Sequence, residues 1–245
     1  MKEVRYFYTP EAAHLTPSQP MVELPDEEAQ HAVRVLRLTE GDEVVLMDGV
    51  GQFYRAELAV VTKKSCVCRV LETLPQQKEW AVHLHLAMAP TKNMDRTEWL
   101  AEKATEIGFD ELTFLRCQFS ERTVIKTERV EKILVSAMKQ SRKAWKPKLN
   151  EMTDFRQFLQ QPFEGGKFIC HCYEQDDLTP KVLLKDVLKR GEDALVLVGP
   201  EGDFSIEEVR MAEKAGFVGV SLGKSRLRTE TAALVAVHLM HLANE

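Results

Sequence analysis

The segment LVLVGPEGDFSIEEVRMAEKAG, from Leu195 to Gly216, decides the fold class. A hydrophobic run stops at GPEG, and residues with helical spacing begin a few positions later. Ser205 and Glu208 have the spacing of a capping box, and Phe204 can pack against Val209 as a hydrophobic staple. The segment therefore predicts a buried strand, a tight loop and a helix whose first turn is set by local chemistry.

The same step from strand to helix recurs on both sides of this segment. Apolar runs predict strands at 80–88, 112–116, 167–172, 194–198 and 218–222. Helical spacing predicts helices at 95–108, 128–145, 206–215 and 229–242, the first closed by a glycine. Alternation of this kind indicates an α/β domain with a mostly parallel sheet and helices on its faces.

The first 70 or so residues read differently, as short β-like runs separated by turns. Asp48-Gly49 and Gly51 supply the turn chemistry between two of these runs. A polar, proline-containing stretch at 72–79 predicts a linker. We expect a β-rich domain at 1–73 and an α/β domain at 74–245.

Composition narrows the class of protein. The chain has 245 residues, 44% of them hydrophobic and 29% charged, and no apolar stretch approaches the roughly 18 residues of a membrane span. The N-terminus carries no apolar signal segment, so we expect a cytoplasmic protein.

The five cysteines are an odd number, and four of them form C-x-C pairs inside apolar runs, so disulfides are not expected. A zinc site can be imagined from one of those pairs with nearby histidines: Cys170, His171, Cys172, His83 and His85. No C-x-x-C or H-x-x-x-H spacing accompanies them, and residues at period two are typical of strands. We therefore predict no metal.

The formal net charge of −5 argues against indiscriminate binding to polyanions. One segment, Lys126 to Lys148, is nevertheless strongly basic, with eight Lys or Arg residues against Glu128 and Glu131. By itself this segment indicates either a solvated helix face or a nucleic-acid contact.

Three loops follow strand ends and can share one ligand, because ligands of open α/β sheets bind outside the carboxyl ends of the strands. They begin at His171, Gly199 and Gly223. Gly199 and Gly202 let backbone approach a ligand closely, and Pro200 stiffens the turn. No G-x-G-x-x-G follows a predicted strand, and GVSLGKS at 219–225 has one residue too few for a phosphate-binding P-loop. Glu201 would repel a phosphate and suits a ligand with positive charge.

Several motifs together carry a resemblance to a known family. LVGPEGDFSIEEV and LGKSRLRTETAALVAV resemble the paired C-terminal motifs of the RsmE-type ribosomal RNA uridine-N3 methyltransferases of the SPOUT superfamily. HAVRVLRLTEGDEVVLMDG resembles the PUA-like domain of that family, and TKNMDRTEWLAEKATEIG and SERTVIKTERV resemble its middle segments. The resemblance covers nearly the whole chain. It implies an N-terminal PUA-like β-barrel and a C-terminal SPOUT α/β domain with a deep trefoil knot.

The resemblance further implies S-adenosyl-L-methionine as cofactor, bound by the three loops. The expected cofactor residues are His171, Glu174, Val198, Gly199, Pro200, Glu201, Gly202, Leu222, Gly223, Leu227, Arg228 and Thr229. Asp203 departs from the family pattern, where Gly is usual; Asp tolerates a left-handed conformation, so a small effect on the loop is expected.

The reaction that the resemblance implies is methylation of N3 of a uridine in 16S ribosomal RNA. Glu230 is a candidate general base and Arg228 a candidate stabiliser of charge on the uracil oxygens. Glu230 can equally serve only to favour the start of the last helix. The expected RNA-binding residues are Arg34, Arg37, Lys92, Arg96, Arg122, Lys139, Arg142, Lys143 and Lys146.

The last predicted helix, 229–242, is apolar on all sides, which predicts burial on more than one side and a homodimer. The expected partner is ribosomal RNA within the small ribosomal subunit. Two alternatives stay open at this point. One is a SPOUT enzyme that methylates a ribose 2′-hydroxyl, and the other is a non-catalytic RNA-binding factor in ribosome assembly.

Overall fold

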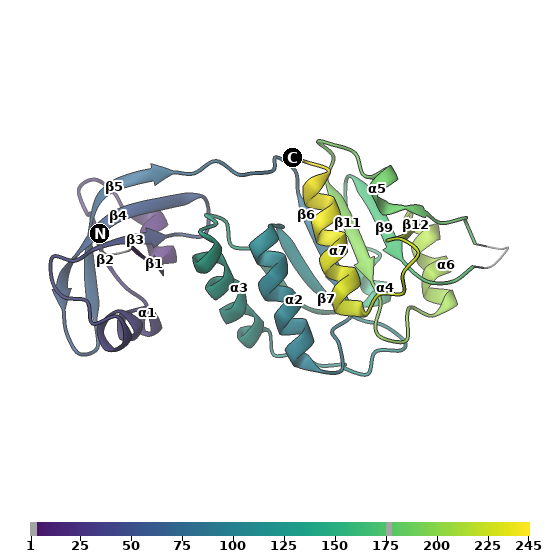
Figure 1. Cartoon of the computed structure of the whole chain (residues 1–245), viewed down its shortest axis with the longest axis horizontal. Coiled ribbons are helices and arrows are strands. Elements are labelled where there is room, and N and C mark those ends of the chain that lie inside the picture. The colour runs from purple at the N-terminus through teal and green to yellow at the C-terminus, as the bar shows by residue number, and fades with distance from the viewer. Residues whose placement is uncertain (1–3, 175–177) are drawn as a thin grey trace. The chain divides into compact units, whose positions relative to one another are not determined.

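The computed structural model describes residues 4–174 and 178–245, which form two compact units (Figure 1). The first unit contains the chain up to Lys78 and returns for Met138–Lys146, and the second contains Glu79–Ala137 and Pro147–Glu245. The units are thus not contiguous in sequence. The domain boundary between residues 73 and 74 stays a prediction.

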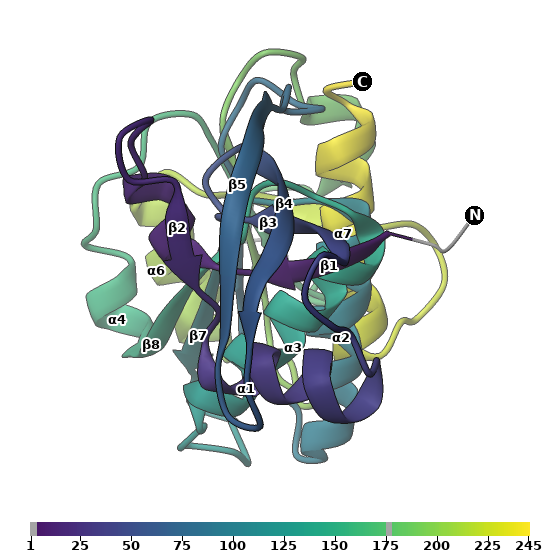
Figure 2. The same cartoon turned by 90° about the vertical axis from the view of Figure 1, so that its left-hand side faces the viewer.

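The first unit is built on a five-stranded sheet in the order β1-β3-β4-β5-β2 (Figure 2). β1 pairs with β3 in parallel, and the other pairs are antiparallel. The strands are β1 (Arg5–Tyr8), β2 (Met21–Glu23), β3 (Glu43–Met47), β4 (Gln52–Val61) and β5 (Cys66–Pro75). Three short helical segments connect them, namely η1 (Pro10–His14), α1 (Asp26–Gln30) and the π-helical turn η2 (His31–Val35).

The turn predicted between β3 and β4 is present. Asp48 Oδ1 accepts hydrogen bonds from the backbone N–H groups of Val50 (2.8 Å) and Gln52 (3.0 Å). Gly49 has φ 80°, which favours glycine at this position. Tyr54 donates to Asp48 Oδ2 from inside the core, and burial raises the pKa of Tyr54 to about 12.

The linker predicted at 72–79 is wrong in its first half. β5 continues to Pro75, and Gln52 of β4 pairs with Pro75. Polar residues there are compatible with a strand because this end of β5 is largely exposed. Only the residues after Pro75 lack regular structure before the next strand.

The second unit contains a seven-stranded sheet in the order β10-β12-β9-β11-β6-β7-β8, with every neighbouring pair parallel. The strands are β6 (Leu84–Met88), β7 (Glu111–Arg116), β8 (Lys148–Asp154), β9 (Gly166–Cys170), β10 (Val182–Leu183), β11 (Ala194–Val198) and β12 (Val218–Ser221). The predicted α/β class and parallel sheet are confirmed. Sequence reasoning missed β8, because this edge strand has a polar sequence and no fully buried residue.

Helices cover both faces of this sheet. One core cluster joins the sheet to α2 (Met94–Ile107), α3 (Thr127–Ser141), α5 (Leu184–Val187) and α7 (Thr229–Leu242). A second cluster joins the opposite face to α4 (Phe155–Phe158) and α6 (Ile206–Lys214). The four predicted helices exist, although α3 ends four residues before the predicted end, and Arg142 after it has φ 56°.

The start of α6 has the local structure that the sequence predicts. Ser205 Oγ accepts from the Glu208 backbone N–H at 3.2 Å, and a Glu208 carboxylate oxygen accepts from the Ser205 N–H at 2.8 Å. Phe204 and Val209 are both fully buried in the same cluster. The capping box thereby holds the end of the preceding loop in place.

The helices of the described residues include none long and apolar enough to cross a membrane.

Candidate active site

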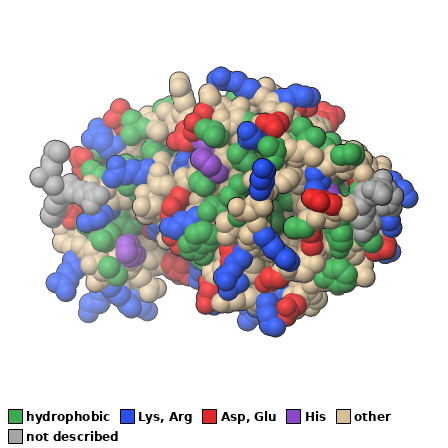
Figure 3. All heavy atoms as spheres, turned by 45° about the vertical axis from the view of Figure 1, so that its right-hand side comes forward, with side chains coloured by type: hydrophobic (Ala, Val, Ile, Leu, Met, Phe, Trp, Pro, Cys, Tyr) green, Lys and Arg blue, Asp and Glu red, His purple; other side chains and the backbone are tan. Residues whose placement is uncertain are grey.

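A cavity of about 570 Å³ opens at the carboxyl ends of β9, β11 and β12. Its walls come from the ends of these strands, the three loops that follow them, the start of α7 and Arg96 of α2. The lining residues are Arg96, Cys170, His171, Cys172, Val198, Gly199, Pro200, Glu201, Gly202, Asp203, Val220, Ser221, Leu222, Gly223, Ser225, Arg226, Leu227, Arg228, Thr229 and Ala232. Figure 3 shows Lys and Arg side chains interleaved with hydrophobic ones on the face of the second unit turned toward the viewer.

Asp203 connects two of the three loops. Its carboxylate accepts hydrogen bonds from the backbone N–H groups of Cys172 and Phe204, each at 2.7 Å. Asp203 has φ 69°, so this position has the left-handed conformation that Asp tolerates. Tyr173 adds a second connection by donating its hydroxyl to the Phe204 carbonyl at 2.8 Å. The residue that departs from the family pattern therefore holds the loop after β9 against the loop after β11.

His171 is the most unusual polar group of the cavity wall. Its residue is 6% exposed, and neither ring nitrogen has a hydrogen-bond partner within residues 4–174 and 178–245. Burial and, to a smaller extent, Lys181 lower the pKa of His171, which keeps the ring neutral. A Cβ at Gly219 would lie 2.8 Å from His171 Nε2, so the ring requires glycine there. His171 is thus a cavity-lining residue whose two ring nitrogens are buried and unpaired within the described residues.

Arg96 lines this cavity, and Glu230 lies beside Arg96 but outside the lining. Arg96 Nε is 3.7 Å from Glu230 Oε1, and Glu230 is 7% exposed. The other carboxylate oxygen, Oε2, is buried and has no hydrogen-bond partner in the described part of the chain. Glu230 is also the second residue of α7, where an acidic side chain is favoured by the helix dipole. Both roles considered for Glu230 thus remain compatible with its position.

The structure brings most of the expected cofactor residues into one wall. Of these residues, Glu174 is the one outside the lining, although it follows β9 in the expected loop. Sequence reasoning missed Cys170, Cys172, Asp203, Val220, Ser221, Ser225, Arg226 and Ala232, and placed Arg96 among RNA contacts only. Ser225 and Arg226 lie between Gly223 and Leu227, two expected cofactor residues, and this position in the sequence is the signal that could have identified them. The individual roles of all these residues stay predictions.

Two expected RNA-binding residues support a loop beside the cavity. Arg122 donates to the carbonyl oxygens of Thr91 (3.1 Å) and Lys92 (2.6 Å). The Lys92 backbone N–H donates to Glu201 Oε1 at 2.8 Å, and its ammonium lies 2.6 Å from Glu121. The hydrogen bond to Glu121 raises the pKa of Lys92. Glu201 therefore anchors this loop, a role that the sequence did not indicate.

The expected RNA-binding residues of the first unit differ in their surroundings. Arg34 and Arg37 are exposed, and Arg37 has φ 54°. Lys139 makes an ion pair with Glu28 at 2.5 Å and is only 22% exposed. Arg142 is exposed, with its guanidinium 5.2 Å from the centre of the Tyr6 ring. Lys143 and Lys146 are half-buried.

The zinc cluster imagined from the sequence does not form among the described residues. Cys170, His171 and Cys172 line the cavity, whereas His83 and His85 group with Glu111 elsewhere in the second unit. The Glu111 hydrogen bond raises the pKa of His83, and burial lowers the pKa of His85 to about 4. Burial raises the pKa of the Cys170 thiol to about 12.

Comparisons with known proteins agree with this geometry. Residues 78–241 match the family model of an RNA methyltransferase domain, and residues 24–71 match that of an RNA methyltransferase PUA domain. A PUA domain and a methyltransferase domain with its cavity in the α/β sheet define the class of RNA methyltransferases, and the chain belongs to this family. The resemblance seen in the sequence is thereby confirmed.

Individual relatives make the relationship more specific. Ribosomal RNA small subunit methyltransferase E of Bacillus subtilis is 30% identical over 92% of this chain and 91% of that protein. A probable rRNA methyltransferase from Porphyromonas gingivalis is 41% identical, with a TM-score of 0.88 over 98% of each chain. A ribosomal RNA small subunit methyltransferase E from Neisseria gonorrhoeae, crystallised with S-adenosyl methionine, is 27% identical, with a TM-score of 0.85 over 99% of this chain and 98% of that chain.

Proposed function

We propose that this chain transfers a methyl group from S-adenosylmethionine to N3 of a uridine in small-subunit ribosomal RNA. The observation that carries the proposal is the convergence of three loops on one cavity that Arg96 also lines, with the buried carboxylate of Glu230 next to Arg96. The names of the relatives point to the same substrate. We expect the protein to act in the cytoplasm, where ribosomal subunits are assembled.

The cavity suits this cofactor in size, polarity and charge. Its volume of about 570 Å³ lies within the range of small-molecule sites. Gly199 and Gly202 line the cavity, where their backbone groups offer polar contacts. An added Cβ at Gly202 would lie 3.4 Å from Phe119, an ordinary van der Waals contact. We propose that the loops around this cavity form the trefoil knot of the superfamily.

When bound, the cofactor supplies an electrophilic methyl group on a sulfonium. The remaining chemistry belongs to the protein. N3 of uridine carries a proton that must leave, and Glu230 Oε2 is the buried acceptor without a partner in the described chain. Arg96 lies beside it, with Nε 3.7 Å from Glu230 Oε1. Arg228, exposed at the N-terminal end of α7 and lining the cavity, is positioned to stabilise charge on a uracil oxygen.

RNA binding requires the target uridine to leave its stacked context, as enzymes acting on a base require. We propose that three exposed arginine side chains of the first unit contact the RNA phosphates next to the target uridine, namely Arg34, Arg37 and Arg142. We further propose a homodimer, because several apolar side chains of α7 remain partly or fully exposed, with Leu242 51% exposed.

The deciding experiment combines binding with product analysis. Calorimetry of the purified chain should detect S-adenosylmethionine binding; its absence would favour a non-catalytic assembly factor. Nucleoside mass spectrometry of 16S RNA from a deletion strain should show loss of N3-methyluridine. Loss of a 2′-O-methylated nucleoside instead would establish the alternative reaction and refute the proposal.

A further inference from the structure

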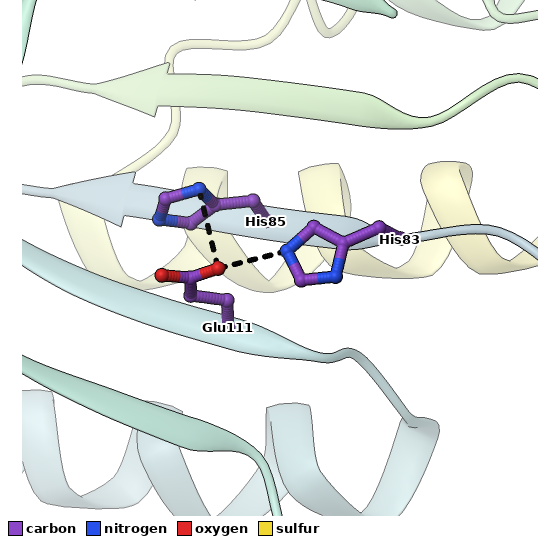
Figure 4. A group of neighbouring side chains, drawn as sticks. All are labelled: His83, His85 and Glu111. Carbon is purple, nitrogen blue, oxygen red and sulfur yellow. Dashed lines mark hydrogen bonds and ion pairs between the residues drawn. The ribbon is translucent and has the colours of Figure 1, made fainter. Parts of the chain in front are cut away.

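His83, His85 and Glu111 form a cluster that the proposed methyl transfer does not use. Figure 4 shows that the imidazole rings of His83 and His85 both face the carboxylate of Glu111. His83 lies just before β6, His85 lies within β6, and Glu111 is the first residue of β7. Their ligand atoms all lie within 4.8 Å of one another. Since all strands of this sheet are parallel, the cluster lies at the amino ends of the strands and the cavity lies at their carboxyl ends.

The three side chains have the atom types and spacing of a metal site. His83 Nε2 is 2.8 Å from Glu111 Oε2, and His85 Nδ1 is 4.0 Å from the same oxygen. Tetrahedral zinc with bonds of about 2.0–2.1 Å places its ligand atoms about 3.3 Å apart. The shorter of these two distances must lengthen and the longer must shorten, each by less than about 1 Å. The two ring nitrogens, which lie within 4.8 Å of each other, must reach the same spacing. Rotations of these side chains can supply such movements without displacing the strands.

His85 provides an independent observation that points to a ligand. Its side chain is 7% exposed, so its ring is held inside the protein. Nε2 is 2.8 Å from Thr113 Oγ1, which orients the ring and leaves Nδ1 aimed at Glu111. At 4.0 Å, Nδ1 is beyond hydrogen-bond distance of that carboxylate. Ligating histidines typically bind a hydrogen-bond partner with their other nitrogen in this way.

The neighbours of Glu111 and His83 hold them in a similar manner. Asn150 Nδ2 donates to Glu111 Oε1 at 2.6 Å, and Lys148 Nζ lies 2.9 Å from the same oxygen. Oε2 is therefore the oxygen turned to the histidines. The backbone N–H of His83 donates to Asp193 at 2.7 Å, which fixes its position, while its side chain is 39% exposed and gives solvent access to the cluster.

We propose that His83, His85 and Glu111 bind a divalent metal ion of the zinc class, with water in the fourth position. Two imidazoles and one carboxylate are a ligand set that Zn²⁺ takes. The ion would connect the starts of β6 and β7 and stabilise this end of the sheet. Methyl transfer at the carboxyl ends of the strands does not require the ion.

Lys148 distinguishes a metal site from a purely structural hydrogen-bond network. Its ammonium lies close to the proposed ion and repels it. Lys148→Met should therefore raise metal affinity several-fold, since the side chain is 68% exposed and its loss leaves no buried group unpaired. In a structural network with no metal, the same change would remove one ion pair and alter no metal affinity.

The test is zinc calorimetry and cobalt absorption on the full chain after treatment with a chelator. The wild-type chain should bind one Zn²⁺ per protomer. Glu111→Gln and His83→Gln should each weaken binding about 10-fold or more, and His14→Gln, which changes an exposed histidine elsewhere, should leave it unchanged. Circular dichroism confirms that the variants fold. Zn²⁺ should also raise the melting temperature of the wild-type chain and not of Glu111→Gln.

Cobalt separates this site from the five cysteines, because thiolate ligands add a sulfur-to-metal charge-transfer band. The proposed site should give Co²⁺ absorption without that band. Equal zinc affinity in wild type and both folded ligand variants would overturn the proposal. So would a thiolate band with unchanged intensity in Glu111→Gln, or no binding of Zn²⁺ at all.

Discussion

Arg96 Nε lies 3.7 Å from Glu230 Oε1 at the edge of the cavity, while the second oxygen of Glu230 is buried without a hydrogen-bond partner in the described chain. A buried carboxylate costs free energy unless it is paired. This arrangement motivates the first prediction.

Glu230→Gln should lower the single-turnover methylation rate by about 100-fold or more, the usual contribution of a general base. Cofactor and RNA binding should be retained, and raising the pH should partly restore the rate because solvent then removes the N3 proton. Arg228→Lys should also slow the reaction, since a point charge cannot replace the planar guanidinium. A lower melting temperature with an intact rate for Glu230→Gln would instead identify the residue as structural.

Gly202→Val should abolish most of the affinity for S-adenosylhomocysteine while leaving the fold intact. Gly202 has no positive φ, and a Cβ there meets Phe119 at 3.4 Å, an ordinary contact. Because Gly202 lines the cavity, we expect the branched side chain to restrict the approach of the cofactor to the backbone there. Calorimetry measures the affinity and a melting curve checks the fold. Gly199 is unsuited to this test, because a Cβ would lie 2.9 Å from the Phe204 backbone nitrogen. Unchanged affinity in folded Gly202→Val would refute the cofactor site.

The pH dependence of cofactor binding should report His171. Its pKa is lowered on folding, chiefly by burial, so the folded chain binds fewer protons than the unfolded one below the ordinary value of about 6.5. Acidification through that range therefore reduces stability, and no such loss occurs above it. Protonation also places a second positive charge near the sulfonium.

Calorimetry across pH should accordingly show constant S-adenosylmethionine affinity near neutral pH and weaker binding once the pH falls through the lowered pKa of His171. S-Adenosylhomocysteine, whose sulfur is uncharged, should weaken less. His171→Gln should remove the difference between the two ligands. An identical pH profile for both ligands in the wild-type chain would exclude this role.

Replacing Arg142, Lys143 and Lys146 by Gln should weaken RNA binding and flatten the slope of log affinity against log salt by roughly 0.7 to 0.9 per lost phosphate contact. Lys139 is left out because its ion pair with Glu28 makes it part of the first unit's structure. The charge-matched control replaces Lys185, Lys189 and Arg190, which lie in the second unit. Equal slopes for both triple variants would make the basic segment a solvated face.

Leu242→Glu should convert a dimer into a monomer at micromolar concentration, as measured by light scattering. Its side chain is 51% exposed on α7, whose opposite side packs into the core through Ala233, Val237 and Met240. Val60→Glu, at an apolar residue of the first unit that is 45% exposed, serves as the control. A wild-type chain that is monomeric would contradict the proposed homodimer outright.

Local patterns in the sequence determined much of this protein. The capping box at Ser205 and the glycine closing α2 are local signals, because each involves residues within a few positions of one another. Apolar runs identified the buried strands of the second sheet, since parallel strands covered on both faces are hydrophobic throughout. The order and spacing of the motifs indicated the family, which the comparisons confirm.

Tertiary structure alone decided the features that depend on distant residues. β8 is polar and was invisible to periodicity, yet it pairs with β7 at the sheet edge. The return of Met138–Lys146 to the first unit comes from packing of Met138 and Ala144 with Val45 and Phe53. Arg96 reaches Glu230 across 134 positions of chain, and His85 meets Glu111 only because β6 and β7 are neighbours. The sequence determines the chemistry of each side chain. Which side chains share a site depends on strand order and burial, and no local sequence pattern encodes these two properties.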